Sequence, residues 1–241
     1  MKVLLSNIVK LTLVIFVGTG CSKDILNETP PHLISSESLY RSLDGFDAGL
    51  NGLYNLARTA RWKSEQLENV LNGVDNMTSN YGRSDIFWNW GTTNSPVDKD
   101  LKFTFEWMYE TINAANTIIN RAEGKDVDWA GGTLTPEANK NRVVAEARAI
   151  RGWAYGRLAY SWGDVPINLE ESRGASIKTD CVRTPVAQIR KPVISDLKFA
   201  QELGPVEVSK QGRLTKGAVQ TILSEMYLTV NKPDSALHWC D

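Results

Sequence analysis

The chain has 241 residues, with 27 Lys and Arg against 28 Asp and Glu, and a formal net charge of −1. Without a basic excess, nucleic acid is a poor candidate partner, because proteins that bind it neutralise phosphates with Lys and Arg. Three cysteines do not make a disulfide framework or a metal cluster, so a folded domain must rest on its hydrophobic core. Eight tryptophans are a high count, and aromatic residues beyond the needs of a core suggest a binding surface.

The first 20 residues have the layout of a bacterial export signal. Lys2 precedes an apolar run, Leu11 to Val17, that is shorter than the roughly 20 residues a transmembrane helix needs. The sequence Gly18-Thr19-Gly20-Cys21 resembles a lipobox, in which the chain is cut before the cysteine and the cysteine is acylated, for example with palmitate. We therefore expect residues 1–20 to be a lipoprotein signal peptide and Cys21 to be the lipidation site. The alternative is an ordinary secretory signal with Cys21 near the cut by chance.

A polar segment follows the cysteine. It contains Pro30-Pro31, and its composition is typical of an extended chain without a core. We expect residues 21–38 to be the lipidated cysteine with a flexible tether, and residues 39–241 to form a folded domain.

Helical spacing of apolar residues predicts two helices before residue 125. The first begins near Asp44, which can cap its first turn. An alternative role for Asp44, with Asp47, is calcium binding. Gly124 ends the second helix. The two apolar stripes are Phe46, Leu50, Leu53, Tyr54 and Ala57, and Phe105, Met108, Ile112, Ala115, Ile119 and Ala122.

Three further helices are predicted in the second half of the chain. Thr135-Pro136 supplies a cap and a first-turn proline for the third helix, which Gly163 ends. Thr184-Pro185 repeats that start for the fourth helix, and the fifth follows Thr215. The predicted inward faces are Val143, Ala147, Ile150, Ala154, Leu158 and Ser161; Ile189, Val193, Leu197 and Ala200; and Ala218, Ile222, Met226 and Val230. No segment shows sustained strand alternation, so we expect an all-α fold.

The C-terminal stretch matches one tetratricopeptide unit. The residues in register are Leu223, Ser224, Tyr227, Asn231, Asp234, Ala236 and Leu237. Helical repeats bury their inner faces only by stacking on neighbours. Because the chain ends at Asp241 inside the expected second helix of this unit, we expect it to be a fragment of a longer protein.

Residues 62–100 combine aromatic and amide side chains with little apolar periodicity. Sugar rings stack on aromatic planes through their C–H faces, while their hydroxyls bond amides and carboxylates. The expected ligand contacts are Trp88, Trp90, Tyr81, Asn76 and Asp85. The alternative is a long loop held to the core by its own tryptophans.

An enzyme is a less favoured interpretation. Asp75 and Asp85 could form the carboxylate pair of a glycoside hydrolase, but acidic residues in polar loops are usually solvated. The two histidines, His32 and His238, lie in the tether and in the truncated repeat, leaving no base near Cys181. Glycine-rich phosphate-binding motifs are also missing, so no cofactor and no metal are expected.

One family resemblance rests on four segments. Residues 146–155 read EARAIRGWAY and residues 160–166 read YSWGDVP. They resemble the SusD/RagB signature, an E-A-R-x-x-R-A-x-x-Y helix followed by an aromatic-Gly-Asp-Val-Pro turn. The segment from Arg183 through Ser195-Asp196-Leu197 and the segment 212–218, GRLTKGA, resemble two further family motifs.

This resemblance implies a fold of tetratricopeptide-like stacked helix pairs with a long irregular loop. It also implies a non-catalytic outer-membrane lipoprotein, facing the cell exterior, that binds an oligosaccharide or glycopeptide and delivers it to a SusC-like TonB-dependent transporter. The C-terminal half of such a protein would be missing here. The alternative is a tetratricopeptide lipoprotein that binds a protein or peptide partner.

Within the motif, residue chemistry favours structural roles. Glu146 and Arg151 lie on a helix, and buried ions are tolerated only when paired, so we expect ion pairs and not catalysis. Gly163 permits the helix end, Asp164 can bond nearby backbone, and Pro166 prevents continuation.

Overall fold

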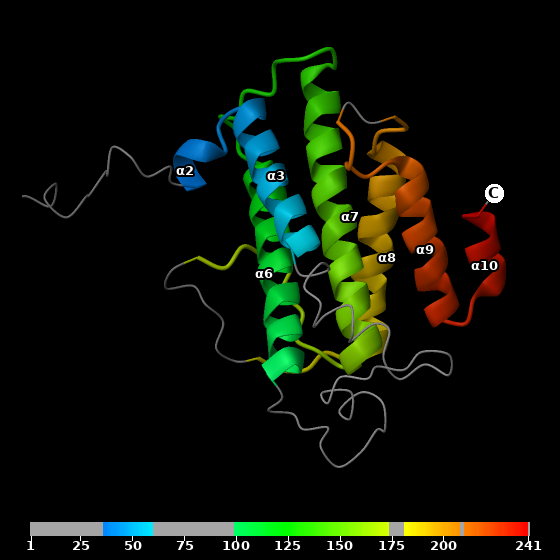
Figure 1. Cartoon of the computed structure of the whole chain (residues 1–241). Helices are drawn as coiled ribbons and strands as arrows, with labels where there is room; N and C mark the ends of the chain where they lie inside the picture. The colour runs from blue at the N-terminus through cyan, green and yellow to red at the C-terminus, as the bar shows by residue number, and fades with distance from the viewer. Residues whose placement is uncertain (1–35, 60–98, 174–180, 208–209, 241) are drawn as a thin grey trace, which may run out of the picture. The chain divides into compact units, whose positions relative to one another are not determined.

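The computed structural model describes residues 36–59, 99–173, 181–207 and 210–240. In these ranges the regular structure is helical, with two isolated β-bridges, Ser42 with Asp128 and Val165 with Thr184. The helices are α2 (Ser36–Leu39), α3 (Leu43–Thr59), α6 (Lys99–Arg121), α7 (Pro136–Trp162), α8 (Val186–Leu203), α9 (Lys216–Thr229) and α10 (Pro233–His238) (Figure 1). The expected all-α fold is confirmed.

The 27-residue helix α7 is the centre of this helical unit. It packs against α3, α6, α8 and α9, while α10 packs on α9. Figure 1 shows α3 and α6 on one side of α7 and α8 and α9 on the other. Because neighbours cover it on both sides, more than half of its residues are buried, as expected for a helix without a single apolar face.

Two hydrophobic clusters hold the helices together, and α7 contributes to both. One lies between α3, α6 and α7, and its most buried members include Phe46, Leu50, Leu53, Ile118 and Val143. The other joins α6, α7, α8 and α9, and includes Ile112, Tyr155, Leu158, Ile189, Leu197 and Leu223. Burial of such side chains contributes about 1.5–3 kcal/mol each, so these clusters dominate the stability of the fold.

The predicted ends of α7 are confirmed. Thr135 is its N-cap, and its hydroxyl accepts a hydrogen bond from the Ala138 N–H at 3.2 Å. Pro136 occupies the first helical position, where its missing N–H costs nothing. Gly163 ends the helix at φ 70°, a left-handed conformation that favours glycine, and its N–H donates to the Ala159 carbonyl at 3.1 Å.

The start of α3 differs from the prediction. Asp44 lies inside the first turn, and Ser42 precedes the helix and accepts a long hydrogen bond from the Gly45 N–H at 3.4 Å. The Leu43 N–H donates to the Asp128 carbonyl at 2.9 Å, and this tertiary contact sets where the helix begins. Asp47 points to Arg142 at 3.0 Å, an arrangement unsuited to calcium.

The start of α8 is also different. Thr184 does not cap it; the Thr184 N–H donates to the Val165 carbonyl at 3.0 Å, and Pro185 occupies the cap position without a side-chain bond. The Val186 N–H instead donates to the Asp164 carboxylate at 2.8 Å. The turn that ends α7 therefore also caps α8, which agrees with the expectation that Asp164 bonds nearby backbone.

Two predicted inward faces need correction. Ser161 is exposed, and the neighbouring Trp162 faces α6 instead, with its ring 5.6 Å from that of Phe105. On α9 the buried residues are Val219, Leu223, Ser224 and Tyr227, one residue along from the predicted stripe, whose members are only partly buried. Both stripes have helical spacing, and contact with α8 and α10 decides between them.

Helices α9 and α10 pack as the predicted tetratricopeptide-like pair. Asn231 adopts φ 55° in the turn between them, and the Ser224 hydroxyl donates to the Ala236 carbonyl at 2.7 Å. Ala236 is buried where the two helices touch, whereas Leu237 is exposed.

The N-terminal expectations fall mostly outside the described residues. These include the signal peptide, Cys21 and most of the tether; α2 makes residues 36–38 helical instead of extended. Among the residues that the structure describes, none of the helices has both the length and the apolar character to cross a bilayer.

Candidate functional site

All five predicted ligand contacts lie outside the described residues: Trp88, Trp90, Tyr81, Asn76 and Asp85. The same holds for Asp75. Their flanks are described: α3 ends at Thr59 and α6 begins at Lys99. The indole N–H of Trp107 on α6 donates to the Leu56 carbonyl at 2.8 Å, so α6 fixes the last turn of α3, from which this segment departs.

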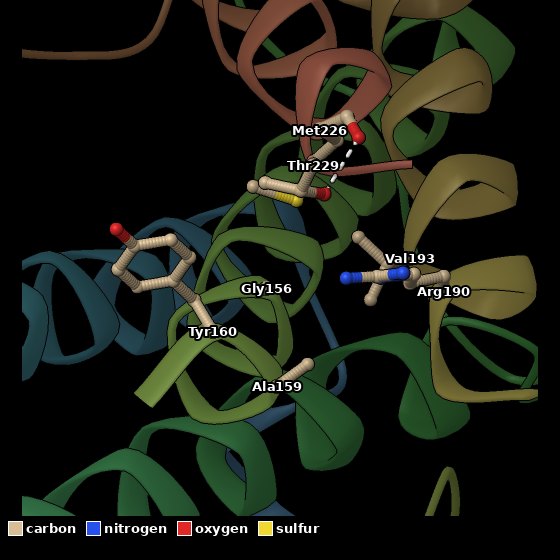
Figure 2. A pocket seen from close by; sticks show the side chains of 7 residues that line it. All are labelled: Gly156, Ala159, Tyr160, Arg190, Val193, Met226 and Thr229. Carbon is tan, nitrogen blue, oxygen red and sulfur yellow. Dashed lines mark hydrogen bonds between the residues drawn. The ribbon is translucent and has the colours of Figure 1, made fainter. Parts of the chain in front are cut away.

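A shallow surface groove lies where α7 ends, α8 begins and α9 ends. Gly156 and Ala159 form its floor, and the space amounts to about 240 Å³ with the open mouth included. Figure 2 shows Tyr160 on one side and Arg190 on the other. The remaining lining residues are Val193, Met226 and Thr229.

Glycine at position 156 allows close packing of α9 on α7 beside the groove. A Cβ atom at Gly156 would lie 2.7 Å from the Met226 sulfur and 3.1 Å from its terminal methyl carbon. Glycine therefore lets the α9 side chain lie directly on α7. The Thr229 hydroxyl donates its proton to the Met226 carbonyl at 2.8 Å, so the Thr229 oxygen is still able to accept a hydrogen bond.

The two residues that flank the groove are unusual among the described residues, Tyr160 for its exposure and Arg190 for its lack of partners. Tyr160 is 75% exposed, although it is a large aromatic residue on the central helix. Arg190 is half-buried, and among the described residues it makes no hydrogen bond or ion pair. Sequence reasoning missed both; an aromatic residue at a solvent-facing position of α7 was the available signal for Tyr160.

The motif residue Arg151 lies in a buried ionic cluster. Its guanidinium forms a two-bond pair with Asp196 at 2.7 and 2.8 Å, and donates to the Asn116 side-chain oxygen at 2.8 Å. All three residues are at most 5% exposed. The cluster ties α6, α7 and α8 together, which confirms the predicted structural role of Arg151.

Glu146 is the centre of a second cluster. Its carboxylate accepts hydrogen bonds from Tyr54 at 2.8 Å, Arg142 at 3.1 Å and Arg213 at 3.0 Å. Burial, and then the adjacent Glu146 charge, raises the pKa of Tyr54 well above its usual range. The Leu214 N–H donates to the Tyr54 oxygen at 2.9 Å, so this cluster joins α3 and α7 to the segment before α9. The predicted ion pairing of Glu146 is confirmed.

Residues 166–172, which we call the strap, cross α6 and α7 without regular structure. Side chains of the helices hold its main chain. Tyr109 donates to the Pro166 carbonyl at 2.6 Å, and Asn116 donates to the carbonyls of residues 168 and 170 at 3.0 Å each. The Tyr155 hydroxyl donates to the Asn168 carbonyl at 2.8 Å and accepts from the Asn168 N–H at 2.7 Å.

The described residues offer little for catalysis or metal chemistry. Glu146 and Asp196, the buried carboxylates, are both neutralised by arginines, and no group of three metal-ligating side chains occurs in the described part of the chain. Glycoside hydrolysis requires two carboxylates on opposite sides of a substrate. The groove beside Tyr160 contains none.

A family model described as "Starch-binding associating with outer membrane", SusD-like, matches residues 25–228. The "SusD-like protein P25" of Formosa agariphila is 24% identical over 247 residues, which covers 98% of this chain and 45% of that protein. A "SusD-like protein" of Bacteroides ovatus is 26% identical over 222 residues, covering 87% and 36%. This chain thus spans less than half the length of these relatives.

Solved structures share the fold. A SusD superfamily protein from Bacteroides vulgatus aligns with a TM-score of 0.70 at 21% identity, over 83% of this chain and 42% of that one. A "laminarin binding SusD-like protein" aligns with a TM-score of 0.67 at 20% identity, over 83% and 43%. The stacked-helix fold expected from the sequence is confirmed.

Proposed function

The chain belongs to the SusD-like family, and from that membership we propose that it binds glycans at the outer membrane as part of a nutrient-uptake system. It captures an oligosaccharide or glycopeptide and delivers it, uncleaved, to a SusC-like TonB-dependent transporter. The observation that carries the proposal is the family match over residues 25–228, because that family is described as starch-binding and associated with the outer membrane.

The ligand-contacting residues in this proposal are Trp88 and Trp90, with Tyr81, Asn76 and Asp85 beside them. Their mixture of aromatic planes and polar side chains suits sugars, which present both C–H faces and hydroxyls. The laminarin-binding relative with the same helical framework supports a glycan as ligand. Peptide binding through the tetratricopeptide-like pair remains the competing outcome of the test.

Cys21 is the proposed lipid anchor. Its lipobox-like sequence supports acylation, and an anchor with several acyl chains holds a protein stably to a membrane. The proposed orientation is toward the cell exterior, where the protein meets polysaccharide. A Cys21→Ser variant should lose incorporation of a labelled fatty acid and leave the membrane fraction, whereas retention of both would exclude this anchor.

Binding without cleavage is supported by the pairing of the buried carboxylates with arginines. Glu146 and Asp196 each face arginine, and the wall of the groove beside Tyr160 supplies no acid. In the described part of the chain, this arrangement provides neither the general acid nor the nucleophile of a glycosidase.

The test is a binding screen of the full-length protein against a polysaccharide array, with product analysis of each hit. We expect retention on at least one glycan without new reducing ends. Trp88→Ala with Trp90→Ala should weaken that binding and leave the helical circular dichroism unchanged. Released sugars would favour a hydrolase, and equal affinity of the double variant would remove both tryptophans from the site.

A further inference from the structure

We propose that the groove between Tyr160 and Arg190 is a separate binding site for one acidic sugar unit of the glycan. The Tyr160 ring stacks on the sugar face, and the Arg190 guanidinium binds its carboxylate or sulfate group. This inference rests on the proposed function and adds to it a ligand class and a second contact point, on described residues outside segment 62–100.

The position of Tyr160 on the surface suits ligand binding and does not contribute to the hydrophobic core. Other aromatic residues of α7 are packed: Tyr155 is 1% exposed, Trp153 contacts the Trp107 ring, and Trp162 contacts the Phe105 ring. Tyr160, at 75% exposure, makes no ring contact among the described residues. Its ring stands clear of the helix in Figure 2. An exposed aromatic plane beside a groove is available to a sugar at no cost to the core.

Arg190 lacks the carboxylate partner that four other arginines of the described residues have. Arg121, Arg142, Arg151 and Arg213 each contact a carboxylate at 3.1 Å or less. Arg190 has no such partner in the described part of the chain, and its nitrogens point over the groove in Figure 2. A guanidinium without a counter-charge favours an anion, and its fork geometry matches a carboxylate or sulfate through two hydrogen bonds.

A second cation lies close to the groove. Arg157 precedes Tyr160 by one helical turn, is half-buried, and also makes no hydrogen bond or ion pair among the described residues. The two arginines give this surface a local positive charge in a chain whose net charge is −1. Charge complementarity therefore favours an acidic unit over a neutral one.

The groove is shallow and open to solvent, and the space within it holds no more than about one water molecule. An occupant would therefore lie across its mouth and not inside it, as a sugar ring does when it stacks on an exposed aromatic side chain. The Thr229 oxygen, whose proton is used, can accept a hydrogen bond from a sugar hydroxyl.

The experiment measures binding of the full-length protein to oligogalacturonides, which carry carboxylates, and to neutral laminarin oligosaccharides of equal length. Arg190→Ala should weaken oligogalacturonide binding about tenfold, as expected for hydrogen bonds to a charged group, and leave laminarin binding unchanged. Tyr160→Ala should weaken binding of the acidic ligand, while Tyr160→Phe keeps the ring and most of the affinity. The preference for the acidic ligand should shrink at high salt.

The matched control is Lys198→Ala, which removes one positive charge from the exposed side of α8 outside the groove. Equal losses in Lys198→Ala and Arg190→Ala would show a general charge effect and overturn the site. Unchanged oligogalacturonide binding in Arg190→Ala and Tyr160→Ala would overturn it while leaving the proposed function intact. Failure of the wild type to bind any glycan would overturn both, and Arg190-dependent binding of polyglutamate alone would replace the sugar by an acidic peptide.

Discussion

Replacing Arg151 with methionine would isolate the contribution of the buried ion pair that joins α7 to α8. Methionine has similar length and keeps much of the packing, but it leaves the Asp196 carboxylate without its two hydrogen bonds. Asp196 is 4% exposed, so water cannot replace them. The Asn116 side-chain oxygen would lose its donor as well.

The expected loss in the free energy of unfolding is about 3–5 kcal/mol, the usual cost of removing one partner of a buried pair. The nearby Arg148 places its Nε 3.9 Å from the Asp196 carboxylate, without a hydrogen bond of its own. Because Arg148 can move toward the unpaired charge, we expect a loss near the lower end of this range. That corresponds to a fall in Tm of about 10 °C for a domain of this size.

Urea unfolding of the full-length protein, followed by far-ultraviolet circular dichroism, measures this loss. The control is Lys140→Met on the same helix, whose pair with Glu123 has a similar distance of 3.2 Å but lies at the surface. It should change stability by less than about 1 kcal/mol. The double variant Arg151→Met with Asp196→Leu removes both charges and should recover most of the lost stability.

A stability of Arg151→Met within about 1 kcal/mol of the wild type would show that the unpaired Asp196 charge carries no large cost. A double variant as unstable as the single one would show that the loss comes from packing and not from an unpaired charge.

Two further predictions concern Tyr155 and Asp164. Burial raises the pKa of Tyr155 from 10.0 to about 12, so the folded state favours the neutral phenol; the stability this gives is present below pH 10 and lost as pH rises to about 12, by about 2–3 kcal/mol. In urea unfolding between pH 8 and 12, Tyr155→Phe should show a smaller alkaline decrease, and an equal decrease would contradict the assignment. Asp164→Ala removes the acceptor of the Val186 N–H and should cost about 1 kcal/mol, whereas Asp164→Asn keeps an acceptor and should cost less; equal losses in thermal unfolding would exclude capping as the cause.

Local signals predicted the helices well where they act within a few residues. Thr135, Pro136 and Gly163 mark both ends of α7, because a cap, a first-turn proline and a left-handed glycine each act on adjacent backbone. Thr184-Pro185 offered the same local signal, but the Val165 carbonyl takes the Thr184 N–H and Asp164 supplies the cap. A contact from 22 residues away was decisive there.

The polar clusters and the groove depend on tertiary contacts that sequence spacing does not contain. Helical spacing suggested ion partners within one turn, and this holds for Glu146 with Arg142. Arg151 instead pairs with Asp196, 45 residues along the chain. Tyr160 and Arg190 likewise come together only because α7 and α8 pack side by side. The tryptophans of segment 62–100 stay a prediction.

The path of the strap is held mainly by its main chain, so it depends little on which side chains the strap carries. Most of the hydrogen bonds that hold it engage its main-chain carbonyls and N–H groups, with Tyr109, Asn113, Asn116, Arg151 and Tyr155 as partners. Glu171 is the exception, because its side chain pairs with Arg121 at 3.0 Å. Any residue type presents the same carbonyl, so substitutions elsewhere in the strap leave the main-chain bonds in place. Mutational sensitivity should therefore concentrate on the helices beneath and on Glu171.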